Sequence, residues 1–500
     1  MPLDQPLAIV LIGSLCLPSA VTAQVAPPAG ASHAVSSASP EPGGAADLER
    51  EASQRMPPRE PIDASGSSAP RPGRAFLQVA AVNGAYALTN LARGQVTARV
   101  TPISWWHNLQ RGWVWDLDRF LVNQIGHPFQ GSQYFSAGRA NGLGFFESAA
   151  LAAFGSGTWE YFGETNHPSL NDFINTSLGG VALGEVLHRT AGLIRGPRGP
   201  ASSRRWRRVA SVAIDPVAGV NHLMSRDGAG VASPPEAFVP RMSGVASTGV
   251  LRRGNNLRSR PATVDPFVQV DLTYGASEID RSRTPYDAFA VRFMAGGGGS
   301  LTEARIRGRL MAEPMVNERL QFSVVQSYHY LGNDAYRFGA QAFETHVSGR
   351  RALTPRLGLV LEGWGGLTVL GAIDSRPLDP AASPILPDRE SAGQGISEGP
   401  RNYDYGPGTT FGGSATLTRR GEPFASAQYE GRTLYSLDGI RANHLLQRAR
   451  ADVILPVRGR FGIGATGEFF DRHSFYQDAA ATVRRYYFPQ LRLYLTWRLP

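Results

Sequence analysis

The stretch EARIRGRL, residues 303–310, alternates between two kinds of side chain at every position. Ala304, Ile306, Gly308 and Leu310 are small or apolar, and the positions between them carry Glu or Arg. Successive side chains of a β-strand point to opposite faces of its sheet, so this strand would have one apolar and one charged face. The stretch therefore predicts a strand in a sheet whose two faces meet different environments.

The same period of two residues recurs through the C-terminal half of the chain. Segments that show it are 268–274, 289–294, 320–330, 336–343, 357–364, 411–417, 425–435, 447–455, 461–469 and 490–499. Such strands suit a transmembrane β-barrel, in which one face meets lipid, the other lines the interior, and closure leaves no free edge. A soluble β-sandwich would show a similar alternation and is the alternative.

Bacterial barrels have an even number of strands, so we expect an antiparallel barrel of about 12 strands over residues 263–500. Aromatic residues near the strand ends, among them Tyr328, Tyr330, Tyr435 and Trp497, fit the belt that such barrels place at the membrane interface. The predicted fold class is α+β, because the region before the barrel has the period of helices.

The N-terminus predicts export. Residues 7–17 are apolar, and the small pair Val21 and Ala23 follows, as in a signal peptide covering residues 1–23, although Asp4 stands where a basic residue is usual. Residues 24–74 are rich in Ala, Pro, Ser and Gly, which predicts a disordered leader. The one cysteine, Cys16, lies inside the predicted signal, so thiolate metal sites and disulfides are excluded from the mature chain.

Residues 75–194 predict a helical domain of about five helices. We place the helices at 76–91, 113–125, 128–142 and 143–162, with a last one that starts at Pro168 and Ser169. Three glycines in that last helix, Gly179, Gly180 and Gly184, would let another helix approach closely. Residues 195–262 are rich in Arg, Gly and Pro and predict a linker, whose arginines could also bind lipid phosphates.

Polar residues concentrate in the helical region, where burial would be costly unless they pair. A catalytic hypothesis makes His127 a base oriented by Glu160 or Asp118. The competing hypothesis is a structural polar cluster, made of Asp116, Asn123, Arg139, Asn141, Glu164, Asp172, Asn175 and Glu185. Glu185 and His188 have the Glu-x-x-His spacing of di-iron bundles, but the second pair that those bundles need is missing, so we expect neither metal nor cofactor.

Several short motifs in order resemble a known family. They are NLQRGWVWDLDRFLVNQIGHPFQGSQYFSAGRANG at 108–142, WEYFGE at 159–164, PSLNDFINTSLGG at 168–180 and GE at 184–185, followed by DPVAGVNHL at 215–223. Together they resemble the bacterial envelope family DUF3943, a domain of unknown function. The matching positions are Trp115, Asp116, Asp118, Asn123, His127, Pro128, Gly131, Tyr134, Arg139, Asn141, Gly142, Trp159, Glu160, Glu164, Pro168, Ser169, Asn171, Asp172, Gly184 and Glu185.

The resemblance implies an exported protein of a Gram-negative bacterium, often with a β-rich C-terminal half, and it brings no established activity. We therefore expect an outer-membrane barrel whose helical domain lies on the periplasmic side and plugs, gates or braces the barrel, in a structural or transport role in the cell envelope. The alternative is an envelope enzyme that acts on lipid or lipopolysaccharide. The expected partners are outer-membrane lipid and lipopolysaccharide, with no nucleic acid, and the sequence gives no oligomeric state.

Overall fold

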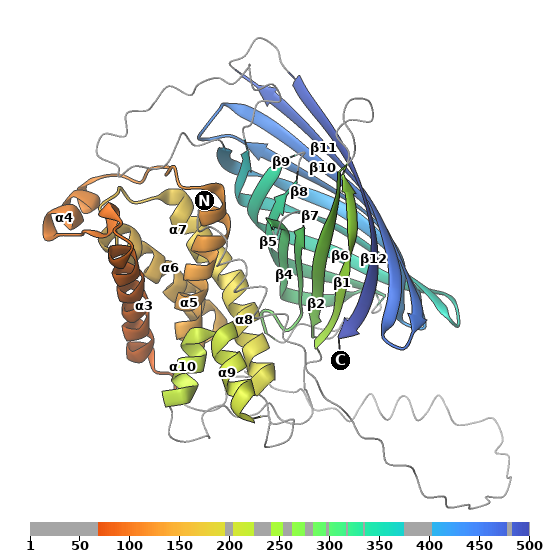
Figure 1. Cartoon of the computed structure of the whole chain (residues 1–500), viewed down its shortest axis with the longest axis horizontal. Helices are drawn as coiled ribbons and strands as arrows, with labels where there is room; N and C mark the ends of the chain where they lie inside the picture. Colours follow the sequence, from red (N-terminus) through yellow and green to blue (C-terminus); the bar gives the residue numbers. More distant parts are fainter. Residues whose placement is uncertain are drawn as a thin grey trace, which may run out of the picture. The chain divides into compact units, whose positions relative to one another are not determined.

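The structure is a computed structural model, which describes residues 69–195, 204–224, 242–253, 263–275, 284–296, 300–316, 319–333, 336–374, 403–477 and 483–499. The predicted signal peptide and all of the predicted leader up to residue 68 lie outside the described residues. Over the rest, helices are followed by strands, which confirms the α+β class (Figure 1).

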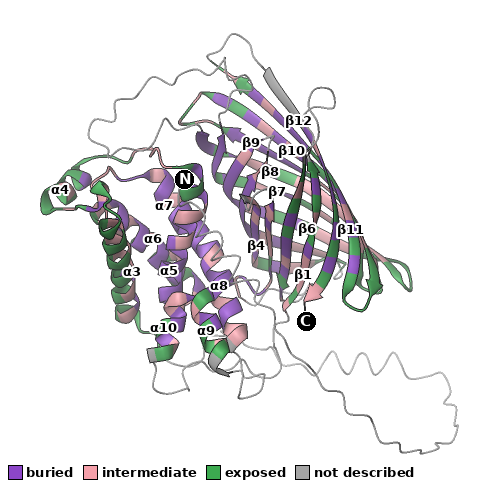
Figure 2. Cartoon of the chain, in the orientation of Figure 1, coloured by how far each residue is buried: buried purple, intermediate pink, exposed green. Residues whose placement is uncertain are grey.

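The helical domain runs from α3 to α10. Its elements are α3 (Pro72–Ala92), η1 (Val96–Ala98), α4 (Pro102–Gln110), η2 (Val122–Gly126), α5 (His127–Arg139), α6 (Phe145–Phe162), α7 (Leu170–Ile174), η3 (Asn175–Gly179), α8 (Gly180–Arg195), α9 (Arg204–Ile214) and α10 (Pro216–Met224). Helix α5 is buried along most of its length, so it is the centre around which the others pack (Figure 2). Among the described residues, none of the helices combines the length and apolarity needed to cross a membrane.

The predicted starts of two helices are confirmed by the residues that form them. Pro128 stands in the first turn of α5, which follows the π-helical turn η2 without a break. Ser169 caps α7 and accepts a hydrogen bond from the backbone N–H of Asp172 at 3.3 Å.

The helix predicted over 113–125 is wrong for most of its length. Residues 113–119 are not helical, and Val114 instead pairs with the chain around Ser169, through a backbone hydrogen bond of 2.9 Å to the carbonyl of Pro168. Polar side chains in this segment bond to distant partners, as Asp116 does to Asn171. Helical spacing of apolar residues could not reveal such a tertiary constraint.

Glycines bring α5 into backbone contact with η3 and α8, as predicted for Gly179, Gly180 and Gly184. A Cβ atom on Gly180 would lie 2.5 Å from the backbone of Gly131, and one on Gly131 would lie 1.8 Å from the carbonyl oxygen of Thr176. Both distances are far below van der Waals contact, so only glycine fits at this crossing.

The strands form a closed antiparallel barrel, and the expected number of twelve is confirmed. The strands are β1 (Met242–Arg253), β2 (Thr263–Tyr274), β3 (Phe289–Gly296), β4 (Ser300–Met315), β5 (Leu320–Gly332), β6 (Arg337–Thr354), β7 (Leu357–Asp374), β8 (Tyr403–Arg419), β9 (Glu422–Tyr435), β10 (Ala442–Arg458), β11 (Phe461–Tyr476) and β12 (Val483–Leu499). Each strand pairs with its sequence neighbours, and β1 closes the barrel by pairing with β12.

The linker predicted over 195–262 is wrong, because this region holds α9, α10 and β1. Strand β1 reads MSGVASTGVLRR, in which Gly, Ser and Thr occupy positions on both faces and hide the period of two. It is a strand because β2 and β12 supply hydrogen-bond partners on both of its sides. The barrel therefore begins at Met242 rather than at residue 263.

The charged faces of the strands point into the barrel. Arg448 on β10 bonds to Glu303 on β4, and these two strands are not neighbours in the barrel, so both side chains must reach across the lumen. By alternation, Ala304 and Ile306 then point outward. The two faces predicted for residues 303–310 are thus an inner charged face and an outer apolar face.

The outer face carries many exposed apolar side chains. They include Val250, Val268, Leu361, Leu367, Phe411, Leu417, Val453, Leu455, Ile463, Phe469, Leu491, Leu493, Leu495 and Trp497. Isolated apolar side chains are common on soluble proteins, but a continuous set over adjacent strands marks a surface that meets an apolar phase or a partner.

Candidate functional site

One hydrophobic core joins the helical domain to the outer wall of the barrel. It contains Phe120, Phe135 and Phe145 from the helical side and Ile306, Tyr328, Tyr330, Tyr403 and Tyr405 from the strands. Trp115 stacks on Tyr405 with 5.4 Å between ring centroids, and Phe145 stacks on Tyr286 at 5.6 Å. Tyr328 and Tyr330, predicted for an interfacial belt, are therefore buried under the helices, and only Tyr435 and Trp497 of the four named remain exposed.

Hydrogen bonds cross the same junction. The Nδ2 atom of Asn123 donates to the hydroxyl of Tyr403 at 2.9 Å, and Gln326 Nε2 donates to the carbonyl of Leu178 at 2.9 Å. Tyr328 donates from its hydroxyl to the carbonyl of Gln124. Ile306 pairs directly with Tyr328, so these two side chains lie on the same, outward face of the barrel. Gln326 lies two residues before Tyr328 on the same strand and therefore points to that face as well. The helical domain thus lies on the wall and not in the lumen.

Beside this junction, Asp116, Asp118, His127 and Asp172 form a group that we call the acid–histidine cluster. His127 Nε2 lies 3.3 Å from Asp172 Oδ1 and 4.0 Å from Asp118 Oδ2. The two aspartates Asp116 and Asp118 come from the extended segment before η2, His127 is the first residue of α5, and Asp172 lies in the first turn of α7. Sequence reasoning named all four residues, and the structure brings them together.

Asn171 is the centre of the hydrogen bonds around this cluster. Its Nδ2 atom lies 2.6 Å from Asp116 Oδ1, 2.8 Å from Asp172 Oδ1 and 3.4 Å from the hydroxyl of Tyr405. Its Oδ1 atom accepts from the backbone N–H of Asp116 at 3.0 Å. Asn171 was noted only as a position matching the family and not as a site residue. The barrel partner Tyr405 could not be found from spacing, because it lies 234 residues further along the chain.

The cluster favours uncharged forms of its buried members. Burial, followed by the charge of Asp172, raises the pKa of Asp116 to about 8. Burial and the charge of Glu160 raise the pKa of Asp172 well above its usual value. Burial lowers the pKa of His127 and outweighs the opposite effect of Asp118 and Asp116. A neutral imidazole beside several acids can accept a proton or bind a cation.

Glu160, one of the two acids that the catalytic hypothesis offers to orient His127, bonds elsewhere. Its Oε2 atom accepts a hydrogen bond of 2.7 Å from the backbone N–H of Ser169, so it holds the start of α7. Of the proposed catalytic residues, only Asp118 approaches His127, and the Asp118 side chain is 48% exposed. A catalytic role for His127, Glu160 and Asp118 stays a prediction.

Glu164 predicts a pH dependence of stability. Its Oε1 atom accepts from Trp159 Nε1 at 3.0 Å, and burial followed by the charge of Asp118 raises its pKa from 4.5 to about 7. Between these values the folded state keeps a proton that the unfolded state has lost, so stability should fall as pH rises from 4.5 to 7. The variant Glu164→Gln should flatten this fall in thermal unfolding followed by tryptophan fluorescence. Glu147→Gln, at an exposed helix start, is the control, and an unchanged pH profile of Glu164→Gln would contradict the assignment.

Arg139 and Glu185 belong to a second, separate network. Arg139 Nε lies 3.0 Å from Glu185 Oε2, and Arg189 Nε lies 2.7 Å from Glu185 Oε1. Burial alone would raise the pKa of Glu185, but the charges of the two arginines outweigh it and lower that pKa. His188 Nδ1 lies 3.4 Å from Asp215 Oδ2. Glu185 and His188, the two residues of the Glu-x-x-His spacing, therefore contact different partners.

Two further members of the predicted structural cluster lie apart from these networks. Asn141 donates to Gln78 Oε1 at 2.6 Å and to the carbonyl of Ala137 at 2.7 Å, which ties the end of α5 to α3. Asn175 is buried in η3, and its Nδ2 atom donates no hydrogen bond to any residue whose position is described. The predicted single polar cluster is thus several distinct groups.

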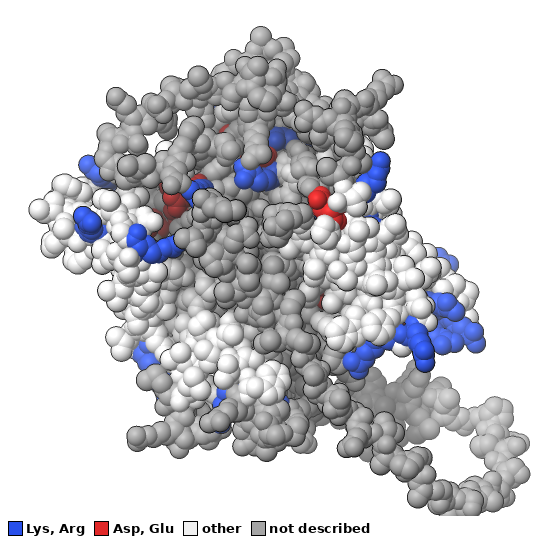
Figure 3. Space-filling view, in the orientation of Figure 1, with Lys and Arg blue, Asp and Glu red and all other residues white. Residues whose placement is uncertain are grey.

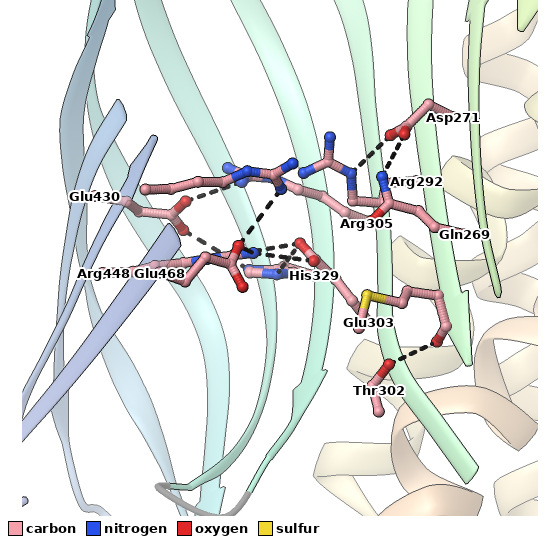
Figure 4. A network of polar contacts seen from close by, with 12 residues as sticks. Gln269, Asp271, Arg292, Thr302, Glu303, Arg305, His329, Glu430, Arg448 and Glu468 are labelled. Atoms are coloured by element: carbon pink, nitrogen blue, oxygen red, sulfur yellow. Dashed lines mark hydrogen bonds and ion pairs between the residues drawn. The ribbon is translucent and has the colours of Figure 1, made fainter. Parts of the chain in front are cut away.

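A third network fills the lumen (Figure 4). Arg305 Nη1 lies 2.8 Å from Glu430 Oε2, and Arg448 lies 3.0 Å from Glu303 Oε1 and 2.6 Å from Glu468 Oε1. These five residues and His329 between them are all buried, although they come from strands on opposite sides of the barrel. At this level the described side chains reach across the lumen.

Comparisons with known proteins found similarities to both parts of the chain. The family described as "Domain of unknown function (DUF3943)" matches residues 112–217. No curated protein matches the chain. The barrel is similar to solved outer-membrane barrels, at low identity.

Among the similar solved structures is the NanC porin, with 7% identity over 51% of this chain and 100% of that one, at a TM-score of 0.26. The KdgM porin has 8% identity over 50% of this chain and 98% of that one, at a TM-score of 0.23. A loop-deletion mutant of OmpT, an outer-membrane protein of Vibrio cholerae, has 9% identity over 52% of this chain and 99% of that one, at a TM-score of 0.20. The resemblance stated for the helical region is confirmed to this extent: the DUF3943 family model matches residues 112–217, in a chain whose C-terminal part is a closed twelve-strand β-barrel.

Proposed function

We propose that this protein is an integral outer-membrane barrel and that its helical domain braces the outer wall of that barrel. The observation that carries the proposal is the shared core, in which helical aromatic residues pack on outward-facing side chains such as Tyr330 and Tyr405. A plug would instead contact inward-facing residues. The DUF3943 domain would then cover part of the wall that lipid covers elsewhere.

The surface of the barrel supports a place in a membrane. The exposed apolar side chains of the outer face match what lipid contact requires. Arginines gather on the short turns at one end, where Arg350, Arg351, Arg356, Arg419, Arg420, Arg458 and Arg460 are exposed. Figure 3 shows blue, basic side chains gathered at one end of the molecule. Arginines at that level can bind lipid phosphates, with phospholipid and lipopolysaccharide as candidate partners.

The helical domain also presents apolar side chains to its surroundings. Leu77 and Leu88 on α3, Trp106 on α4, and Phe146 and Phe154 on α6 are exposed. Their presence favours a helical domain that touches the membrane while it rests on the wall. A position on the periplasmic side stays a prediction.

A bracing role is better supported than transport. Because buried ion pairs occupy the lumen, the barrel has no need of a separate plug. For the enzyme alternative, only Asp118 of the two acids proposed to orient His127 approaches it, at 4.0 Å. The wall contact is the feature that an experiment must test.

A disulfide can test the brace, because the mature chain is predicted to have no cysteine. A Cβ atom on Gly339 would lie 2.8 Å from the Cγ atom of Gln124, so the two positions are close enough for a bridge. The double variant Gln124→Cys with Gly339→Cys should form an intramolecular disulfide in the cell envelope, seen as a shift on non-reducing gels. The outer-membrane fraction should contain this product, in a form whose gel migration changes on heating.

The control variant carries its second cysteine at Gly467 and keeps Gly339. Gly467 is an outward-facing position on β11, and no atom lies within 4 Å of a Cβ placed there. Gln124→Cys with Gly467→Cys should stay unbridged. Absence of the bridge in the Gly339 variant, with normal protein level, would reject the brace, and a fully soluble protein would reject the membrane location.

A further inference from the structure

We propose that Asp118, His127 and Asp172 bind a divalent transition-metal cation at the junction of the helical domain and the barrel. One oxygen of each carboxylate and one ring nitrogen of His127 all lie within 4.8 Å of one another. Ligand atoms about 2.1 Å from a tetrahedral zinc ion lie about 3.4 Å apart. The 3.3 Å between His127 Nε2 and Asp172 Oδ1 already has this value, and the 4.0 Å to Asp118 Oδ2 needs a small contraction.

His127 supplies an observation that is independent of the acidic residues. The residue is only 8% exposed, yet neither of its ring nitrogens makes a hydrogen bond within the described part of the chain. Buried polar atoms without such partners are uncommon in folded proteins. Because Nε2 lies within 4.0 Å of an oxygen of each of the two carboxylates, a cation bound between them would give this nitrogen a partner.

The surroundings hold the carboxylates in position. Asn171 Nδ2 donates to Asp172 Oδ1 at 2.8 Å, and the same atom donates to Asp116 Oδ1 at 2.6 Å. Such outer contacts orient the ligands of metal sites. Asp116 and Glu160 add further carboxyl groups beside the site, and the charge of Arg119 acts on Asp118. The acids outnumber this one cation, so a bound metal would offset their repulsion.

The donor set selects the kind of metal. An imidazole nitrogen favours zinc and its neighbours in the transition series, whereas magnesium and calcium prefer sites made only of oxygen. Three protein ligands leave a fourth tetrahedral position open for water. The site is thus expected to prefer Zn²⁺ over Mg²⁺ and Ca²⁺.

Zinc binding to the purified full-length chain in detergent tests this proposal. After treatment with EDTA and its removal, titration with Zn²⁺ in a calorimeter should show one saturable site per chain at micromolar concentration. Millimolar Mg²⁺ or Ca²⁺ should not displace the metal. His127→Gln and Asp172→Asn should each weaken Zn²⁺ binding at least tenfold, while the folded form on unheated gels stays unchanged.

His188→Gln is the matched control. His188 is also a partly buried histidine beside an aspartate, Asp215, but it lacks a third ligand. This variant should bind Zn²⁺ as the wild type does. No saturable binding by the wild type, or equal loss in His188→Gln, would overturn the proposal. The disulfide test of the brace uses other residues, so the two proposals can fail separately.

Discussion

Replacing Glu303 by alanine should destabilise the barrel by about 3 kcal/mol, because it removes one of the two counter-charges of the buried Arg448. Glu303 is 1% exposed and lies 3.0 Å from Arg448 Nη1 and 3.4 Å from His329 Nε2. Arg448 keeps Glu468 as a partner, which limits the loss. Urea unfolding, followed by the change in gel migration, measures the effect.

The control for this prediction is an ion pair at the surface. Glu422 pairs with Arg498 at 3.1 Å, but the side chains are 62% and 41% exposed, so Glu422→Ala should change stability by less than about 0.5 kcal/mol. The double variant Glu303→Ala with Arg448→Met should recover part of the loss, since it removes both buried charges. Equal effects of Glu303→Ala and Glu422→Ala would show that the lumen network does not stabilise the barrel.

Gly131→Ala should destabilise the helical domain by about 3 kcal/mol, the upper part of the range for overpacked interiors. The new methyl group would meet the backbone of η3 and α8, at 1.8 Å from the carbonyl oxygen of Thr176. Backbone cannot rotate away as a side chain can, so α5 and α8 must separate. Thermal unfolding followed by helical circular dichroism should show a lower midpoint for the helical domain.

Gly192→Ala is the matched control on α8. No atom lies within 4 Å of a Cβ placed on Gly192, and alanine favours a helix over glycine by up to about 1 kcal/mol. This variant should therefore be neutral or slightly more stable. A Gly131→Ala chain as stable as Gly192→Ala would contradict the close helix crossing.

Helix boundaries followed from the sequence where local chemistry decides them. Pro128 and Ser169 act within one turn of their own position, so the starts of α5 and α7 were predictable. The segment around Asp116 was not, because its partner Asn171 lies on another part of the chain. Strand β1 could not be predicted for a similar reason, because hydrogen bonds from the neighbouring strands β2 and β12 hold this segment extended.

The candidate site residues, like the helix boundaries, were predictable from the sequence only in part. His127, Asp118 and Asp172 stood out as polar residues in an apolar region, but only the structure shows that His127 meets these two aspartates rather than Glu160. Their grouping depends on how α5, α7 and the segment before η2 pack. Spacing along the chain carries no information on that packing.

The sequence by itself determined the two faces of each strand, because a period of two is a local property of an extended chain. It thereby determined a charged lumen and an apolar wall. Only the tertiary structure decided which part of that wall the helices cover, since helices and lipid both select apolar side chains. It also decided that Glu303 meets Arg448, because pairing across a lumen depends on closure and strand register.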